Sequence, residues 1–96
     1  MNLQKFKDSL THDSAPTGVS PHLQAMWHER KGDWDAAHRL IQDESDADGS
    51  WVHAYLHRQE GDQPNAAYWY RRAGKPVSEK SLEVEWAEIV AALLAK

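Results

Sequence analysis

The stretch HAYLHRQEGD, which begins at His53, carries the side chains best suited to metal or acid–base chemistry. His53 and His57 are four residues apart, so on a helix they lie one above the other, as in two-histidine zinc sites. Glu60 follows on the same stripe and could be a third ligand or could orient His57 by a hydrogen bond. His28 or His38 could add a group from another helix. A divalent metal site, with zinc as the first candidate, is therefore one hypothesis for this stretch.

Motifs that would identify a known chemistry are missing from the rest of the chain. The metalloprotease pattern H-E-x2-H is absent, since Ala-Tyr-Leu separates the two histidines. Phosphate-binding loops and serine-nucleophile motifs are also absent, and the chain has no cysteine. We therefore expect no catalysis by the protein itself. An enzyme that uses His53, His57 and Glu60 is the alternative.

The aromatic and basic residues of YWYRR form a second candidate binding group. In one interpretation Trp69 and Tyr70 are core residues, while Arg71 and Arg72 are solvated. In the other, Tyr68 and one of the arginines grip an acidic peptide or a phosphate, because the planar guanidinium binds such groups in a bidentate manner. The sequence leaves both interpretations open.

Composition limits the classes of partner. The chain has 96 residues, 41% hydrophobic and 27% charged, which is typical of one globular domain. A formal net charge of −4 argues against a nucleic-acid partner, because such proteins need a clustered basic surface. No apolar run approaches the roughly 18 residues of a membrane span. The first ten residues lack the apolar core of a secretory signal, so we expect a cytoplasmic protein with no membrane partner.

An internal repeat organises the middle of the chain. Residues 24–37 and 53–66 share the pattern A-x2-H-x3-G-D-x3-A. The glycine can close one helix in the left-handed conformation, and the aspartate can cap the next, so each unit predicts an αα-hairpin. His28 and His57 occupy the same slot of the two units. They could therefore simply fill space between helices, which is the alternative to a metal site.

Helical spacing continues through the rest of the sequence and predicts an all-α fold. Residues 1–19 are predicted to form an N-terminal segment with a short helix and a loop, and residues 20–96 to form the helical domain. Within that domain we expect helices over residues 21–31, 34–43, 50–60 and 63–73, and a long final helix capped by Ser78.

The stretch AYLHRQEGDQPNAAYWYRRAG (54–74) resembles tetratricopeptide and Sel-type helical-hairpin repeats, and KGDWDAAHRLI (31–41) does so more loosely. The resemblance implies a right-handed array of hairpins that binds proteins or peptides in a concave groove. We therefore predict a non-catalytic protein- or peptide-binding module of tetratricopeptide-like hairpins, which the final helix caps. A metal- or small-ligand-binding protein is the alternative. The apolar face of the final helix is broad, so homodimerisation is a further hypothesis.

Overall fold

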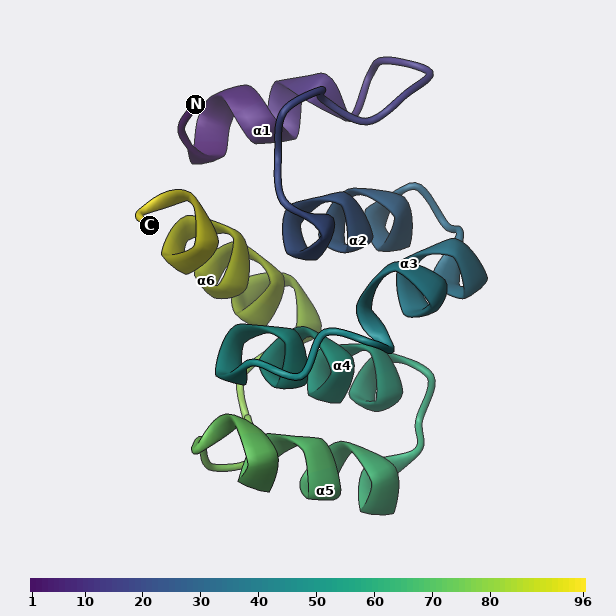
Figure 1. Cartoon of the computed structure of the whole chain (residues 1–96), viewed down its shortest axis with the longest axis vertical. Helices are drawn as coiled ribbons and strands as arrows, with labels where there is room; N and C mark the ends of the chain where they lie inside the picture. The colour runs from purple at the N-terminus through teal and green to yellow at the C-terminus, as the bar shows by residue number, and fades with distance from the viewer.

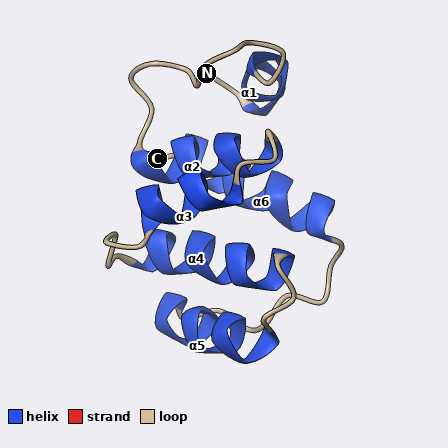
Figure 2. Cartoon of the chain, turned by 90° about the vertical axis from the view of Figure 1, so that its right-hand side faces the viewer, coloured by secondary structure: helices blue, strands red, loops and turns tan.

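The chain folds into six α-helices without any strand, in a computed structural model that describes residues 1–96 (Figure 1, Figure 2). The predicted all-α class is confirmed. The helices are α1 (Leu3–Ser9), α2 (Pro21–Arg30), α3 (Trp34–Ile41), α4 (Ala47–Gln59), α5 (Gln63–Ala73) and α6 (Leu82–Leu94).

Two Gly-Asp junctions turn the chain back on itself, between α2 and α3 and between α4 and α5. Gly32 and Gly61 have φ angles of 88° and 89°, which glycine adopts without the steric cost that a Cβ would bring. Asp33 and Asp62 each accept a hydrogen bond from the amide three residues later, at 3.0 and 3.3 Å. Figure 2 shows α2, α3, α4 and α5 stacked in chain order.

The main core is shared by α1, α2, α3, α4 and α6. Trp86 of α6 is buried and donates from Nε1 to the carbonyl oxygen of Met26 in α2 at 3.1 Å. Its ring also meets that of Phe6 in α1, with centroids 5.9 Å apart. The short α1 is thereby held against the last helix, and α6 contacts both α2 and α4.

Small side chains allow the helices of each hairpin to approach closely. Four alanines have no exposed surface, two in the first hairpin and two in the second: Ala25, Ala37, Ala54 and Ala66. In the second hairpin, two of them form a separate core cluster with Tyr70. The repeated alanines of the sequence pattern therefore mark the seams of the hairpins.

Three helix limits differ from the sequence expectation by two residues or more, and the ends of α2 and α4 differ by one. The last helix begins at Leu82, where Ser81 accepts from the Val84 amide at 3.1 Å, and not at Ser78. Ser78 caps only a turn, since its hydroxyl accepts from the Lys80 amide. The fourth helix begins at Ala47 rather than residue 50, because Asp46 accepts from the Gly49 amide at 2.8 Å and caps it earlier. The third helix ends at Ile41, two residues before the expected limit.

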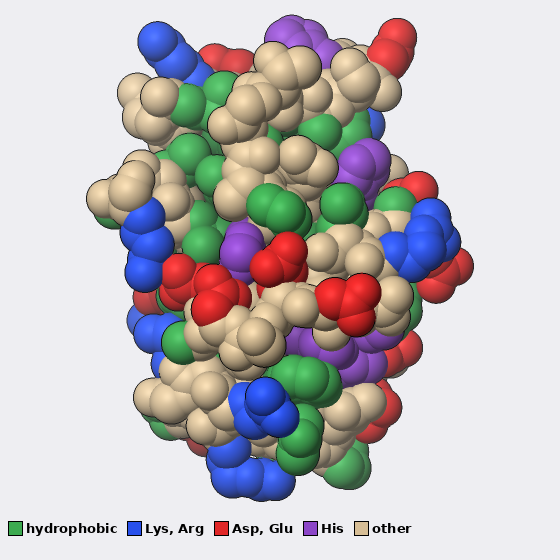
Figure 3. Space-filling model, viewed as in Figure 1, with side chains coloured by type: hydrophobic (Ala, Val, Ile, Leu, Met, Phe, Trp, Pro, Cys, Tyr) green, Lys and Arg blue, Asp and Glu red, His purple; other side chains and the backbone are tan.

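The exterior mixes basic and acidic side chains over the face that Figure 3 shows. Histidine side chains gather on that face at the level of α4, below α3 (Figure 3). None of the six helices has the length and apolar character that crossing a bilayer requires.

Candidate functional site

Three histidines converge where α3 packs against α4. His53 and His57 lie on successive turns of α4, and His38 comes from α3. The Nε2 atoms of His38 and His53 are 3.1 Å apart. One ring nitrogen from each of the three lies within 4.8 Å of the other two. Both α4 histidines are buried and His38 is half-buried, so the three form a cluster inside the molecule that opens beside α3.

Two tryptophans form the walls of this histidine cluster. Trp34 stacks on His38 with ring centroids 4.9 Å apart and an interplanar angle of 11°. On the opposite side, Trp69 of α5 stacks on His53 at 3.8 Å and 13°. Trp34 is itself fixed, since its Nε1 donates to the carbonyl oxygen of Leu56 at 2.8 Å. The walls restrict the rotation of both imidazoles, which preorders the cluster.

Glu60 determines the orientation of His57. The carboxylate accepts a hydrogen bond from Nδ1 of His57 at 2.6 Å. A proton on Nδ1 leaves the lone pair of the neutral ring on Nε2. A carboxylate in this position fixes the tautomer of a metal-binding histidine and makes it a better donor. Of the two roles that the sequence suggested for Glu60, this geometry matches the orienting one.

The electrostatic environment of the cluster favours the neutral forms of His53 and His38. Burial, followed by the charges of His57 and His38, lowers the pKa of His53 from 6.5 to about 4. Burial and then His57 also lower the pKa of His38, although Glu60 and Asp35 act in the opposite direction. Both imidazoles are therefore neutral at pH 7, the form in which histidine binds a metal ion.

The donor set fits a divalent transition metal. Two imidazole nitrogens on one tetrahedral zinc ion, each about 2.0–2.1 Å from the metal, are about 3.3 Å apart. The 3.1 Å between the Nε2 atoms of His38 and His53 is close to that separation. Without a metal, one of these two nitrogens must donate a proton to the other. The same spacing thus serves either a histidine–histidine hydrogen bond or a shared ion.

His28, the counterpart of His57 in the repeat, lies outside the cluster. It is half-buried on α2, where its ring meets Trp27 edge-on with centroids 5.1 Å apart. The helix that contributes the third histidine is α3, so His38 is the partner among the two that the sequence left open. His28 and His57 therefore occupy the same position of the repeat but have different neighbours.

The predicted residues on α5 lie on its outer side. Tyr68 is 43% exposed, and its hydroxyl accepts from Nη1 of Arg72 at 3.2 Å. Arg71 is also exposed, whereas Tyr70 is buried. Tyr68, Arg71 and Arg72 line none of the hollows of the molecule. They form an exposed basic and aromatic patch.

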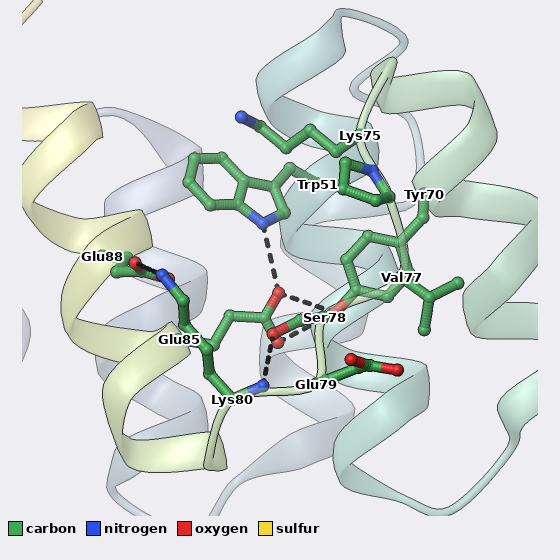
Figure 4. Close-up of a pocket in the computed structure, with 10 residues that line it drawn as sticks. Trp51, Tyr70, Lys75, Val77, Ser78, Glu79, Lys80, Glu85 and Glu88 are labelled. Atoms are coloured by element: carbon green, nitrogen blue, oxygen red, sulfur yellow. Dashed lines mark hydrogen bonds and ion pairs between the residues drawn. The ribbon is translucent and has the colours of Figure 1, made fainter.

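Sequence reasoning missed a buried carboxylate, Glu85. Its oxygens accept from the Tyr70 hydroxyl at 2.6 and 2.8 Å, from Arg58 Nη1 at 2.8 Å and from Trp51 Nε1 at 3.3 Å. Figure 4 shows this carboxylate at the base of a hollow beside α6. The helical spacing does indicate that position 85 is buried, since it lies four residues before Ile89 on the buried stripe of the helix.

Comparisons with protein-family models, with curated proteins and with solved structures find no match for this chain.

Proposed function

We propose that this protein binds a divalent transition-metal ion, of which zinc is the first candidate, through His38, His53 and His57. The observation that carries the proposal is the convergence of three ring nitrogens within 4.8 Å, two of them 3.1 Å apart. Three imidazoles are a donor set that zinc accepts readily, and Glu60 supplies the outer carboxylate that supports such sites.

Three protein ligands would leave one position of a tetrahedral ion for water or for a small ligand. His38 is half-buried whereas the other two histidines are buried, so the cluster is most accessible on the side of α3. A metal ion at this position would polarise a bound ligand and would lower the pKa of a bound water. The residues of the chain contribute the binding, the orientation of His57 and the aromatic walls.

Metal binding would also join the two halves of the repeat. His38 belongs to the first hairpin, while His53 and His57 belong to the second. An ion that binds only the folded chain stabilises it by about 4 kcal/mol at a free concentration 1,000 times Kd. The proposed function therefore has a structural consequence that does not depend on any catalytic activity.

Isothermal titration with zinc chloride and elemental analysis of the untagged protein test the proposal. The expected result is one equivalent of bound metal in the wild type and loss of binding in His38→Ala and His53→Ala. Glu60→Gln should weaken binding about 10- to 100-fold, because the outer carboxylate is lost.

His28→Ala is the matched control, since it removes a half-buried histidine outside the cluster and should bind zinc as the wild type does. Circular dichroism of each variant separates loss of ligand from loss of fold. Absence of bound metal in the folded wild type overturns the proposal. So does an equal loss of affinity in His28→Ala.

A second proposal is the protein- or peptide-binding module that the tetratricopeptide-like resemblance implies. Two hairpins with the same Gly-Asp turn support it, together with the exposed Tyr68 and Arg72 on α5. An acidic hexapeptide should then shift the NMR signals of both residues, and Tyr68→Ala with Arg72→Ala should abolish the shift. Arg39→Ala, an exposed arginine on α3, is the control. No shift in the wild type counts against this proposal.

A further inference from the structure

The hollow with Glu85 at its base lies between the loop of residues 75–81 and α6. It has a volume of about 660 Å³, and six consecutive loop residues, 75–80, form much of its lining. Trp51 and Tyr70 supply two aromatic rings, and Glu85 lies at its base (Figure 4). The metal proposal uses none of these residues.

The polar groups at the base of this hollow already have partners within the chain. The buried carboxylate of Glu85 accepts hydrogen bonds from α4 and α5 and forms an ion pair with Arg58 at 2.8 Å. At the rim, Lys80 forms an ion pair with Glu88. These groups fix the shape of the hollow, and their charges are compensated within the chain.

Two charged groups of the lining remain without an ion pair. One is the carboxylate of Glu79, which is exposed on the loop. The other is Lys75, whose ammonium group lies over the ring of Trp51, 4.1 Å from the centroid. Figure 4 shows the Lys75 side chain extended along the indole. The ammonium group of Lys75 thus lies on an aromatic surface of the hollow, although the carboxylate of Glu79 in the same lining has no ion pair.

An ammonium group on an indole face is held by the negative potential of the ring, and the attraction grows as water is excluded. Lys75 is exposed, so its side chain can swing away at little cost. A second cation that takes its place gains the same ring and finds the unpaired carboxylate of Glu79 in the same lining. The net charge of −4 favours approach of a basic partner over an acidic one.

We infer that the hollow between residues 75–81 and α6 accepts a lysine side chain of a partner peptide, with Lys75 as its internal competitor on Trp51. The incoming ammonium group takes the place of that of Lys75 over Trp51, and the unpaired carboxylate of Glu79 in the same lining attracts it. This inference does not depend on the metal site.

Titration of the full chain with acetyl-Gly-Lys-Gly-amide, followed through the indole N–H signal of Trp51 by NMR, tests it. The expected result is a saturable shift, which the peptide with norleucine in place of lysine does not produce, because norleucine keeps the four-carbon stem but lacks the ammonium group. In Lys75→Ala, binding should tighten about two- to fivefold, because the internal competitor is gone. Glu79→Gln should weaken it.

Lys31→Ala is the matched control, since Lys31 lies over Trp27 at 5.3 Å in a place without this hollow, and its removal should change nothing. n-Butylammonium chloride distinguishes the source of the cation: weaker binding than the peptide supports a peptide partner, and equal or tighter binding overturns that assignment. Equal shifts with the norleucine peptide overturn the inference, as does unchanged affinity in Lys75→Ala.

Discussion

Several donors of the core converge on a single buried carboxylate, that of Glu85. It is 1% exposed and binds Arg58, Tyr70 and Trp51. Glu85→Gln removes the charge that compensates Arg58 and places amide hydrogens among existing donors. We expect a loss of about 3–5 kcal/mol in the free energy of unfolding, measured by urea denaturation.

The control for this prediction is Glu88→Gln. Glu88 pairs with Lys80 on the surface, and such exposed pairs contribute less than about 1 kcal/mol. If the two variants lost comparable free energy of unfolding, burial of the carboxylate would not explain the contribution of Glu85.

For Glu29 we predict the opposite effect: removing its charge should raise the free energy of unfolding. It accepts from the Tyr55 hydroxyl at 2.6 Å, and burial raises its pKa above 4.5 despite that hydrogen bond and Arg30. The folded state therefore binds a proton more readily than the unfolded state, so stability is lost as pH rises through the folded pKa. Glu29→Gln keeps an acceptor for Tyr55 without the charge, and we expect it to be more stable than wild type at pH 7.

Urea denaturation at pH 4.5 and pH 7 checks this prediction, because the advantage of Glu29→Gln should shrink at the lower pH. Glu79→Gln, at an exposed position, serves as the control and should follow the wild type at both values. A variant less stable than wild type at pH 7 would contradict the argument.

For single residues, the sequence predicted interacting side chains within one helix but not interacting side chains on different helices. The relation of His57 to Glu60 follows from positions three apart on α4, and the hydrogen bond is present. The contact of His38 with His53 depends on how α3 packs against α4, which no local spacing determines. His38 was therefore one of two candidates. Glu85 was missed because a charged residue on an apolar stripe gives no sign of its partners.

At the scale of elements, the Gly-Asp turns were predictable because all of their determinants are local. A left-handed glycine and a capping aspartate act within four residues of the chain. The start of α6 was not predictable in the same way. Ser78 and Ser81 are both capping types, and the choice of Ser81 is accompanied by burial of Glu85 and Trp86 in the turn that follows.

Gly49 shows how packing overrides helix propensity in the first turn of α4. A Cβ at this position would lie 2.5 Å from the carbonyl oxygen of Glu44. Propensity alone predicts that Gly49→Ala stabilises the helix by up to about 1 kcal/mol. We expect the reverse, a lower Tm, because the backbone before α4 must shift.

Thermal denaturation followed by circular dichroism measures this effect. Ala47→Gly, at an exposed position of the same helical turn, is the control and should cost about 1 kcal/mol or less. A higher Tm in Gly49→Ala would show that the segment before α4 yields easily.

At the scale of the molecule, a repeated sequence does not create repeated surroundings. The two hairpins share turns and alanine seams, yet His28 meets Trp27 whereas His57 meets two other histidines and Glu60. The difference arises because α3 packs against α4 and places His38 beside His57. The sequence therefore predicted the hairpins well and the site only in part.

Homodimerisation through α6 stays a prediction at this scale. Much of the apolar face of α6 is buried in the core, but Leu82 and Val84 remain 38% and 48% exposed. Light scattering at high concentration should give the mass of a dimer, and Val84→Glu should return it to the monomer. A monomeric mass for the wild type at high concentration would contradict this prediction.

Metal binding offers the strongest test of how the two hairpins act together. Because His38 lies in the first hairpin and His53 and His57 in the second, an ion held by all three opposes their separation. Zinc should therefore raise the Tm of the wild type and slow amide hydrogen exchange in both α3 and α4. His38→Ala removes the only ligand from the first hairpin. In that variant zinc should protect neither α3 nor α4, because binding is lost. Equal protection of α3 in wild type and His38→Ala would show that the ion does not connect the hairpins.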